Sequence, residues 1–103
     1  FDFGTVYNNI AWSYCCLQKY SEGLPYAERA VALNPEHDYS WETIGELYFF
    51  LERYQDCIDA MTRCLSCDGV DQKKSALNFR GKSLIKLGKK SLGRKDLDAA
   101  SKM

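Results

Sequence analysis

The sequence predicts an all-α protein built from three similar helix-turn-helix hairpins that stack as a solenoid. Several residues of the first third recur at a constant spacing of 34, as Tyr7 recurs in Trp41 and Ala11 in Gly45. The other pairs at this spacing are Ile10 and Ile44, Tyr14 and Tyr48, Tyr20 and Tyr54, Ala30 and Cys64, and Val31 and Leu65. The chain has only two prolines and no strand-like alternation, which favours helices. A period of this length is typical of units that bury their apolar faces only against neighbouring units.

The first repeat, approximately residues 4–37, is expected to contain helices over 4–18 and 21–33. Their apolar stripes, with spacings of three and four, are Tyr7, Ile10, Ala11, Tyr14 and Leu17, then Leu24, Ala27, Ala30, Val31 and Leu33. Pro25 lies near the start of the second helix, where its missing N–H costs little. The pair Asn34-Pro35 is expected to end that helix.

The second repeat, residues 38–71, is expected to contain helices over 38–51 and 54–66. Their apolar stripes are Trp41, Ile44, Gly45, Tyr48 and Leu51, then Cys57, Ile58, Met61, Cys64 and Leu65. Asp68-Gly69 is a turn signal that closes the repeat. Small residues at Ala11 and Gly45 are expected to let the two helices of each hairpin approach closely.

The third repeat, residues 74–103, is weaker, with helices expected over 72–87 and 90–102. Gly81 follows Gly45 at a spacing of 36, so two extra residues are expected in the loop around 68–72. The apolar residues of these helices are Leu77, Gly81, Leu84, Ile85 and Leu87, then Leu92, Leu97 and Ala100. Since Leu92 and Leu97 have no covering helix after them, we expect an uncapped face at this end.

Composition fits a single domain, residues 1–103, and we expect the chain to be a piece of a longer protein. The net charge is zero, but residues up to Gly69 carry four Lys or Arg against eleven Asp or Glu, and later residues ten against three. No apolar run approaches the roughly 20 residues that span a bilayer. An odd number of cysteines, five, fits a reducing, cytoplasmic setting better than a disulfide framework.

The motif Trp41-x2-Ile44-Gly45-x2-Tyr48 resembles the opening of a tetratricopeptide repeat. The first copy follows the same pattern through Pro35, whereas the third has Leu77 in place of the aromatic opener and Arg80 in place of an aliphatic residue. The resemblance implies a right-handed superhelix whose first helices line a concave groove. It also implies a protein-interaction module that binds a peptide or partner segment, and no enzymatic activity.

Helical spacing places a set of polar and aromatic residues on the groove side of these first helices. The candidate peptide-binding residues are Asn8, Asn9, Trp12, Tyr39, Glu42, Glu46, Phe49, Asn78, Phe79 and Lys82. Glu42 and Glu46, one turn apart, suggest a basic partner, although such pairs on a helix face are more often solvated. Phe49 could equally pack between hairpins. The alternative function is a structural scaffold or self-association segment of a longer tetratricopeptide repeat protein, possibly a homo-oligomer.

Other chemistry is not expected. Cys64-x2-Cys67 resembles half of a zinc site, but His37 is the only histidine and no second pair follows. The sequence therefore predicts no metal, cofactor or catalytic residue. The positions that clamp a carboxylate in chaperone-binding relatives carry no cation here. The basic stretch around Lys86 and Lys89 is interpreted as a solvated face. Zero net charge argues against nucleic-acid binding. No membrane partner is expected.

Overall fold

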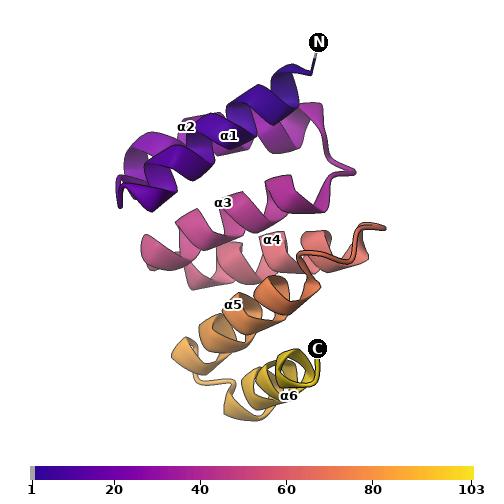
Figure 1. Ribbon diagram of the computed structural model, residues 1–103. Helices are drawn as coiled ribbons and strands as arrows, with labels where there is room; N and C mark the ends of the chain where they lie inside the picture. Colours follow the sequence, from indigo (N-terminus) through magenta and orange to yellow (C-terminus); the bar gives the residue numbers. More distant parts are fainter. Residues whose placement is uncertain (1) are drawn as a thin grey trace.

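The computed structural model describes residues 2–103, which form six α-helices and no strand. The helices are α1 (Phe3–Cys16), α2 (Tyr20–Leu33), α3 (Asp38–Phe50), α4 (Tyr54–Ser66), α5 (Lys73–Lys86) and α6 (Lys90–Ser101). Each boundary lies within two residues of its prediction, and the all-α fold class is confirmed. Successive helices pair as hairpins, and the hairpins stack along the chain (Figure 1).

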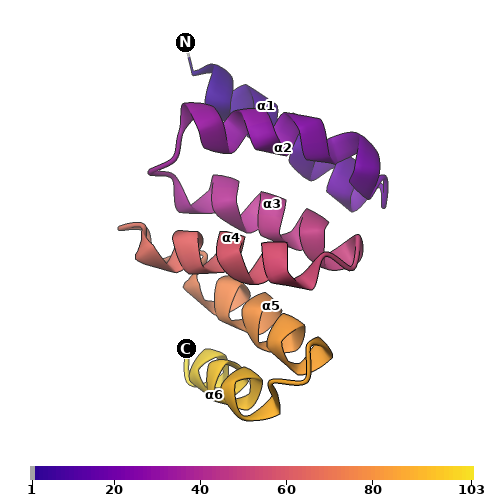
Figure 2. The same ribbon diagram turned by 180° about the vertical axis from the view of Figure 1, so that it is seen from behind.

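The first helices of the three hairpins form one side of the stack. α3 contacts both α1 and α5 in addition to its hairpin partner α4. Seen from behind, α2 and α4 come to the front (Figure 2). This arrangement means that residues on α1, α3 and α5 can share one surface although they are far apart in sequence.

The turn inside each hairpin has the same backbone geometry. In the first hairpin the amide of Lys19 donates to the carbonyl of Tyr14 at 2.9 Å, and Gln18 between the helices has a left-handed φ of 61°. The corresponding left-handed residues in the next turns are Glu52, with φ 61°, and Gly88, with φ 85°. Because α1 ends at Cys16, Leu17 is not part of the packed stripe as predicted but is 65% exposed.

Small residues bring the helices of the third hairpin into backbone contact. A Cβ atom at Gly81 would lie 2.8 Å from the carbonyl oxygen of Gly93, and one at Gly93 would lie 2.6 Å from the carbonyl oxygen of Gly81. The closest approach of α5 and α6 therefore falls at Gly81 and Gly93, and Ala100 farther along α6 is buried. At Gly45 the nearest atoms belong instead to the flexible side chain of Met61.

Two buried clusters fill the spaces between hairpins, and Trp41 and Tyr48 pack against both. The first cluster comprises Ala11, Cys15, Ala27, Ile44, Leu47 and Ala60, and the second comprises Cys57, Met61, Cys64 and Ala76. The aromatic side chains of Trp41 and Tyr48 thus fill space between the hairpins. The core is therefore continuous through α3.

An ion pair explains why the third hairpin departs from the repeat pattern. Arg80 donates from Nε to Asp96 Oδ2 at 2.7 Å and from Nη2 to Oδ1 at 2.9 Å, which links α5 to α6. Both side chains are largely buried. The expected uncapped face is only partly present, because Leu97 packs over Gly81 while Leu92 is 56% exposed.

Candidate functional site

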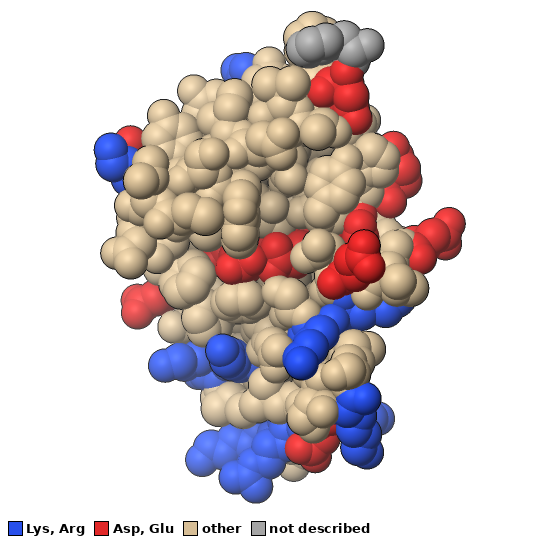
Figure 3. Space-filling view, in the orientation of Figure 1, with Lys and Arg blue, Asp and Glu red and all other residues tan. Residues whose placement is uncertain are grey.

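The predicted groove residues come from the three first helices. α1 carries Asn8, Asn9 and Trp12; α3 carries Tyr39, Glu42, Glu46 and Phe49; α5 carries Asn78, Phe79 and Lys82. On this side of the molecule the surface over α1 is almost free of charge, acidic groups lie across the middle, and Lys and Arg side chains dominate below (Figure 3). The uneven charge seen in the sequence thus becomes a gradient along the stack.

A hollow of about 200 Å³ opens between α1 and α3. Its lining is Asn8, Asn9, Trp12, Tyr39, Glu42, Thr43 and Gln72, so five predicted residues converge here. Trp12 is 44% exposed, as expected for a groove aromatic. Thr43 lies on the same groove side of α3 as Tyr39 and Glu42. Gln72, which helical spacing does not predict, reaches the hollow from the loop before α5. The volume is below the roughly 300 Å³ of a typical small-molecule pocket and suits one side chain.

Asn8 brings an unsatisfied acceptor to this hollow. Its side chain is buried, with 7% of its surface exposed, and its Oδ1 has no hydrogen-bond partner. Buried amide oxygens are normally paired, since an unpaired one costs on the order of 1–3 kcal/mol. Such an atom at the wall of a hollow can accept a hydrogen bond from a group that enters the hollow.

The acidic pair on α3 is not a solvated pair: Glu42 is buried and Glu46 is partly buried. Glu42 is 4% exposed, and its Oε2 accepts a hydrogen bond of 2.5 Å from Ser75 Oγ on α5. Burial, followed by the hydrogen bond to Glu42 and its charge, raises the pKa of Glu46 to about 9. The carboxyl group of Glu46 is therefore protonated at neutral pH.

The aromatic residues farther along the surface are packing residues. The rings of Phe49 and Phe79 meet edge to face with centroids 5.2 Å apart, and both pack on the second buried cluster. The open question about Phe49 is thus decided in favour of packing between hairpins. Lys82 Nζ lies 5.5 Å from the centre of the Phe79 ring. The structure does not bring Glu46, Phe49, Asn78, Phe79 or Lys82 into the hollow.

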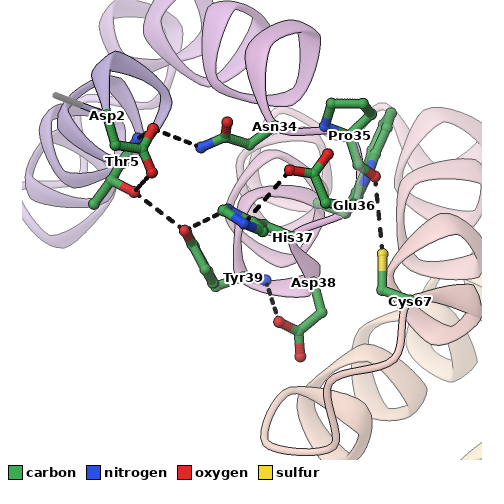
Figure 4. A network of polar contacts seen from close by, with 10 residues as sticks. Asp2, Thr5, Asn34, Pro35, Glu36, His37, Asp38, Tyr39 and Cys67 are labelled. Carbon is green, nitrogen blue, oxygen red and sulfur yellow. Dashed lines mark hydrogen bonds and ion pairs between the residues drawn. The ribbon is translucent and has the colours of Figure 1, made fainter.

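A polar network fixes Tyr39 at the rim of the hollow (Figure 4). The Tyr39 hydroxyl lies 3.2 Å from Thr5 Oγ1 and 2.6 Å from His37 Nδ1. Asp2 accepts from the Thr5 amide at 3.1 Å and from Asn34 Nδ2 at 2.9 Å, which caps α1. Hydrogen bonds from Thr5 and Asn34 lower the pKa of Asp2 to about 2. Sequence reasoning missed this network, because its members are separated by up to 34 residues.

The buried thiols are placed for packing, not for reaction. Burial raises the pKa of Cys15 to about 12, of Cys57 to about 11 and of Cys64 to about 12. A thiol rather than a thiolate is a weak nucleophile and a weak metal ligand. Within residues 2–103, no three His, Cys, Asp or Glu side chains are grouped so that they could hold a metal ion. None of the described helices is long and apolar enough to cross a membrane.

Stacked hairpins with a shared inner surface define this molecule as a helical-repeat protein. A family profile described as the tetratricopeptide repeat matches residues 39–69, which cover α3, α4 and the turn between them. The second hairpin therefore matches the tetratricopeptide repeat family, as its sequence motif predicted. Tetratricopeptide repeats are generally protein–protein interaction modules and generally not enzymes. A search of curated proteins gives no match.

Proposed function

We propose that this chain binds an extended segment of a partner protein across α1, α3 and α5, with the hollow beside Trp12 as the central contact. The observation that carries the proposal is that five residues, chosen from helical spacing on two different helices, line one hollow. The chemistry of the surface limits what the partner segment presents.

Two exposed residues supply the contacts that such a segment needs. Trp12 offers a large, rigid apolar surface, and exposed tryptophans of this kind often dominate binding energies. Asn9 is exposed beside it, and its amide can both donate to and accept from the backbone of an extended peptide. Farther along, Lys82 is exposed and reaches an acidic group of the same segment.

The electrostatics favour a segment with at least one basic residue. Glu42 lies in the wall of the hollow, and acidic groups occupy the middle of the inner surface in Figure 3. Five free cysteines, three of them buried, fit a reducing compartment such as the cytoplasm for this interaction.

The test is a selection of peptides from a random display library on the immobilised chain. Enriched peptides are expected to contain Lys or Arg and to bind the Trp12→Ala variant at least tenfold more weakly. Leu17→Ala is the matched control, because Leu17 is an exposed apolar residue in the turn after α1, outside the hollow. Peptides that bind both variants equally would contradict the assignment to this hollow.

Self-association is the second candidate, and one observation favours it. α1 contains no Asp, Glu, Lys or Arg, and its exposed residues include Phe3 at 59% and Val6 at 38%. An uncharged exposed helix face is typical of an interaction surface. Light scattering at low and high salt tests this: a salt-resistant dimer that Val6→Glu dissociates supports the scaffold function, and a monomer at all concentrations refutes it.

A further inference from the structure

We propose that the hollow lined by Asn8, Trp12 and Glu42 receives the ammonium group of a lysine side chain from the bound segment. The inference rests on the proposed function, because the lysine belongs to a partner segment. It goes further by naming the group that enters the hollow and the proton that leaves.

The acceptors that a lysine needs are already in place. Asn8 Oδ1 is a buried acceptor without a donor, and Glu42 is a buried carboxyl group on the opposite helix. Only one oxygen of Glu42 is used by Ser75. An ammonium group has three donors and no acceptor, so it can donate to Asn8 Oδ1 and to a carboxyl oxygen of Glu42 together.

The shape of the hollow favours lysine over arginine. A volume of about 200 Å³ accommodates a compact ammonium on a narrow stem, whereas a planar guanidinium needs a wide fork of paired acceptors. Trp12 stands at the opening with 44% of its surface exposed. Its ring can cover the methylene stem of the lysine while the charged end reaches Asn8 and Glu42.

Binding of the ammonium is expected to release a proton. Before binding, Glu46 is protonated, because burial, the hydrogen bond to Glu42 and the charge of Glu42 raise the pKa of Glu46 to about 9. A cation in contact with Glu42 stabilises the doubly ionised pair, and the proton leaves to solvent. The surrounding titratable or charged groups are Cys15 on α1, His37 and Tyr39 beside the N-terminus of α3, Asp38 in its first turn, Cys57 and Cys64 on α4 and Lys73 on α5. The three thiols stay neutral at physiological pH because their pKa values are raised.

The probe is a capped pentapeptide with a central lysine between alanines, titrated into the 103-residue chain and followed by amide chemical shifts. The reference peptide has norleucine in place of lysine, which keeps the stem and lacks the charge. We expect the lysine peptide to bind at least tenfold more tightly and to shift the side-chain amide of Asn8. An opposite charge typically lowers a carboxyl pKa by roughly one to three pH units. If binding lowers the pKa of Glu46 by about two pH units, Kd is about tenfold lower at pH 8 than at pH 6.

Variants separate this site from general charge attraction. Glu42→Gln is expected to remove the preference for lysine, whereas Glu28→Gln, the same change on an exposed residue of α2, keeps it. Asn8→Ala is expected to weaken the lysine peptide several-fold and is a second test if Glu42→Gln unfolds. Glu46→Gln is expected to abolish the pH dependence, while His37→Gln leaves it unchanged.

The outcomes distinguish the two proposals. Equal binding of the lysine and norleucine peptides, or binding of neither, overturns the ammonium site even if library peptides still require Trp12. A lysine preference that survives Glu42→Gln overturns it as well. If the lysine peptide binds at Asn8 but no library peptide depends on Trp12, the ammonium site stands and the extended groove fails. A Kd independent of pH overturns the proton release.

Discussion

Replacing Gly93 by alanine is expected to destabilise the third hairpin by roughly 2 kcal/mol. The new Cβ would lie 2.6 Å from the carbonyl oxygen of Gly81 and 2.6 Å from Cγ1 of Ile85. A normal carbon–oxygen contact is about 3.3–3.6 Å, so α5 and α6 would have to separate by about 0.7–1 Å. Neither obstacle is the end of a flexible chain that could turn away.

The magnitude follows from two opposing effects. Overpacking of a rigid contact costs about 1–3 kcal/mol, and a backbone obstacle places this case at the upper end. Alanine is favoured over glycine in a helix interior by about 1 kcal/mol, which offsets part of the cost. The remaining loss of roughly 2 kcal/mol corresponds to a fall in Tm of about 8–16 °C for a domain of this size.

The assay is thermal and urea unfolding followed by circular dichroism at 222 nm. Gly45→Ala is the matched control, because the new Cβ would meet Cε and Sδ of Met61 at 2.6 Å and 2.8 Å, and that side chain can move. Its change in unfolding free energy is expected to stay within about 1 kcal/mol of zero, since the propensity gain offsets the adjustment. A Tm for Gly93→Ala equal to or above that of the wild type would refute the packing argument.

Three further predictions concern the turns, the ion pair and the buried carboxyl groups. Gly88→Ala is expected to cost about 1 kcal/mol in urea unfolding, because φ is 85° and no atom lies within 4 Å of the new Cβ, so only backbone strain acts. Asp96→Ala is expected to cost about 2–3 kcal/mol by leaving the largely buried guanidinium of Arg80 unpaired, and Arg80→Leu in the same chain should recover part of this loss. Stability is expected to fall as the pH rises from about 5 to 9, because the raised pKa of Glu46 makes the folded state bind more protons than the unfolded state in that window. Glu46→Gln should flatten the pH profile of Tm, and an unaltered profile would contradict the raised pKa of Glu46.

The fold could be predicted from the sequence because its information is local and repeated. A spacing of 34 between Ala11 and Gly45 fixes the unit, and the stripes at three and four residues fix the helices within it. Each turn also contains one residue with a left-handed φ, at Gln18, Glu52 and Gly88. Only at Gly88 does the residue type itself indicate this conformation. The error at Leu17 came from extending an apolar stripe past the end of its helix.

Helical spacing alone could also identify half of the candidate site. Asn8, Asn9 and Trp12 share one face of α1 whatever packs against it, and Tyr39 and Glu42 share the corresponding face of α3. What the spacing could not give is how far each face is covered by the next hairpin. Phe49 follows the same periodicity as a groove residue, yet it is packed against Phe79.

The sequence by itself determined the repeat, the six helices and the family resemblance, because each depends on residues a few positions apart or on one regular period. Only the tertiary structure decided that Glu42 is buried under Ser75, that Asn8 is left without a donor, and that Arg80 departs from the pattern to meet Asp96. These contacts join residues between 16 and 33 positions apart or depend on burial between hairpins, and burial is a property of the stacked solenoid that no single helix encodes.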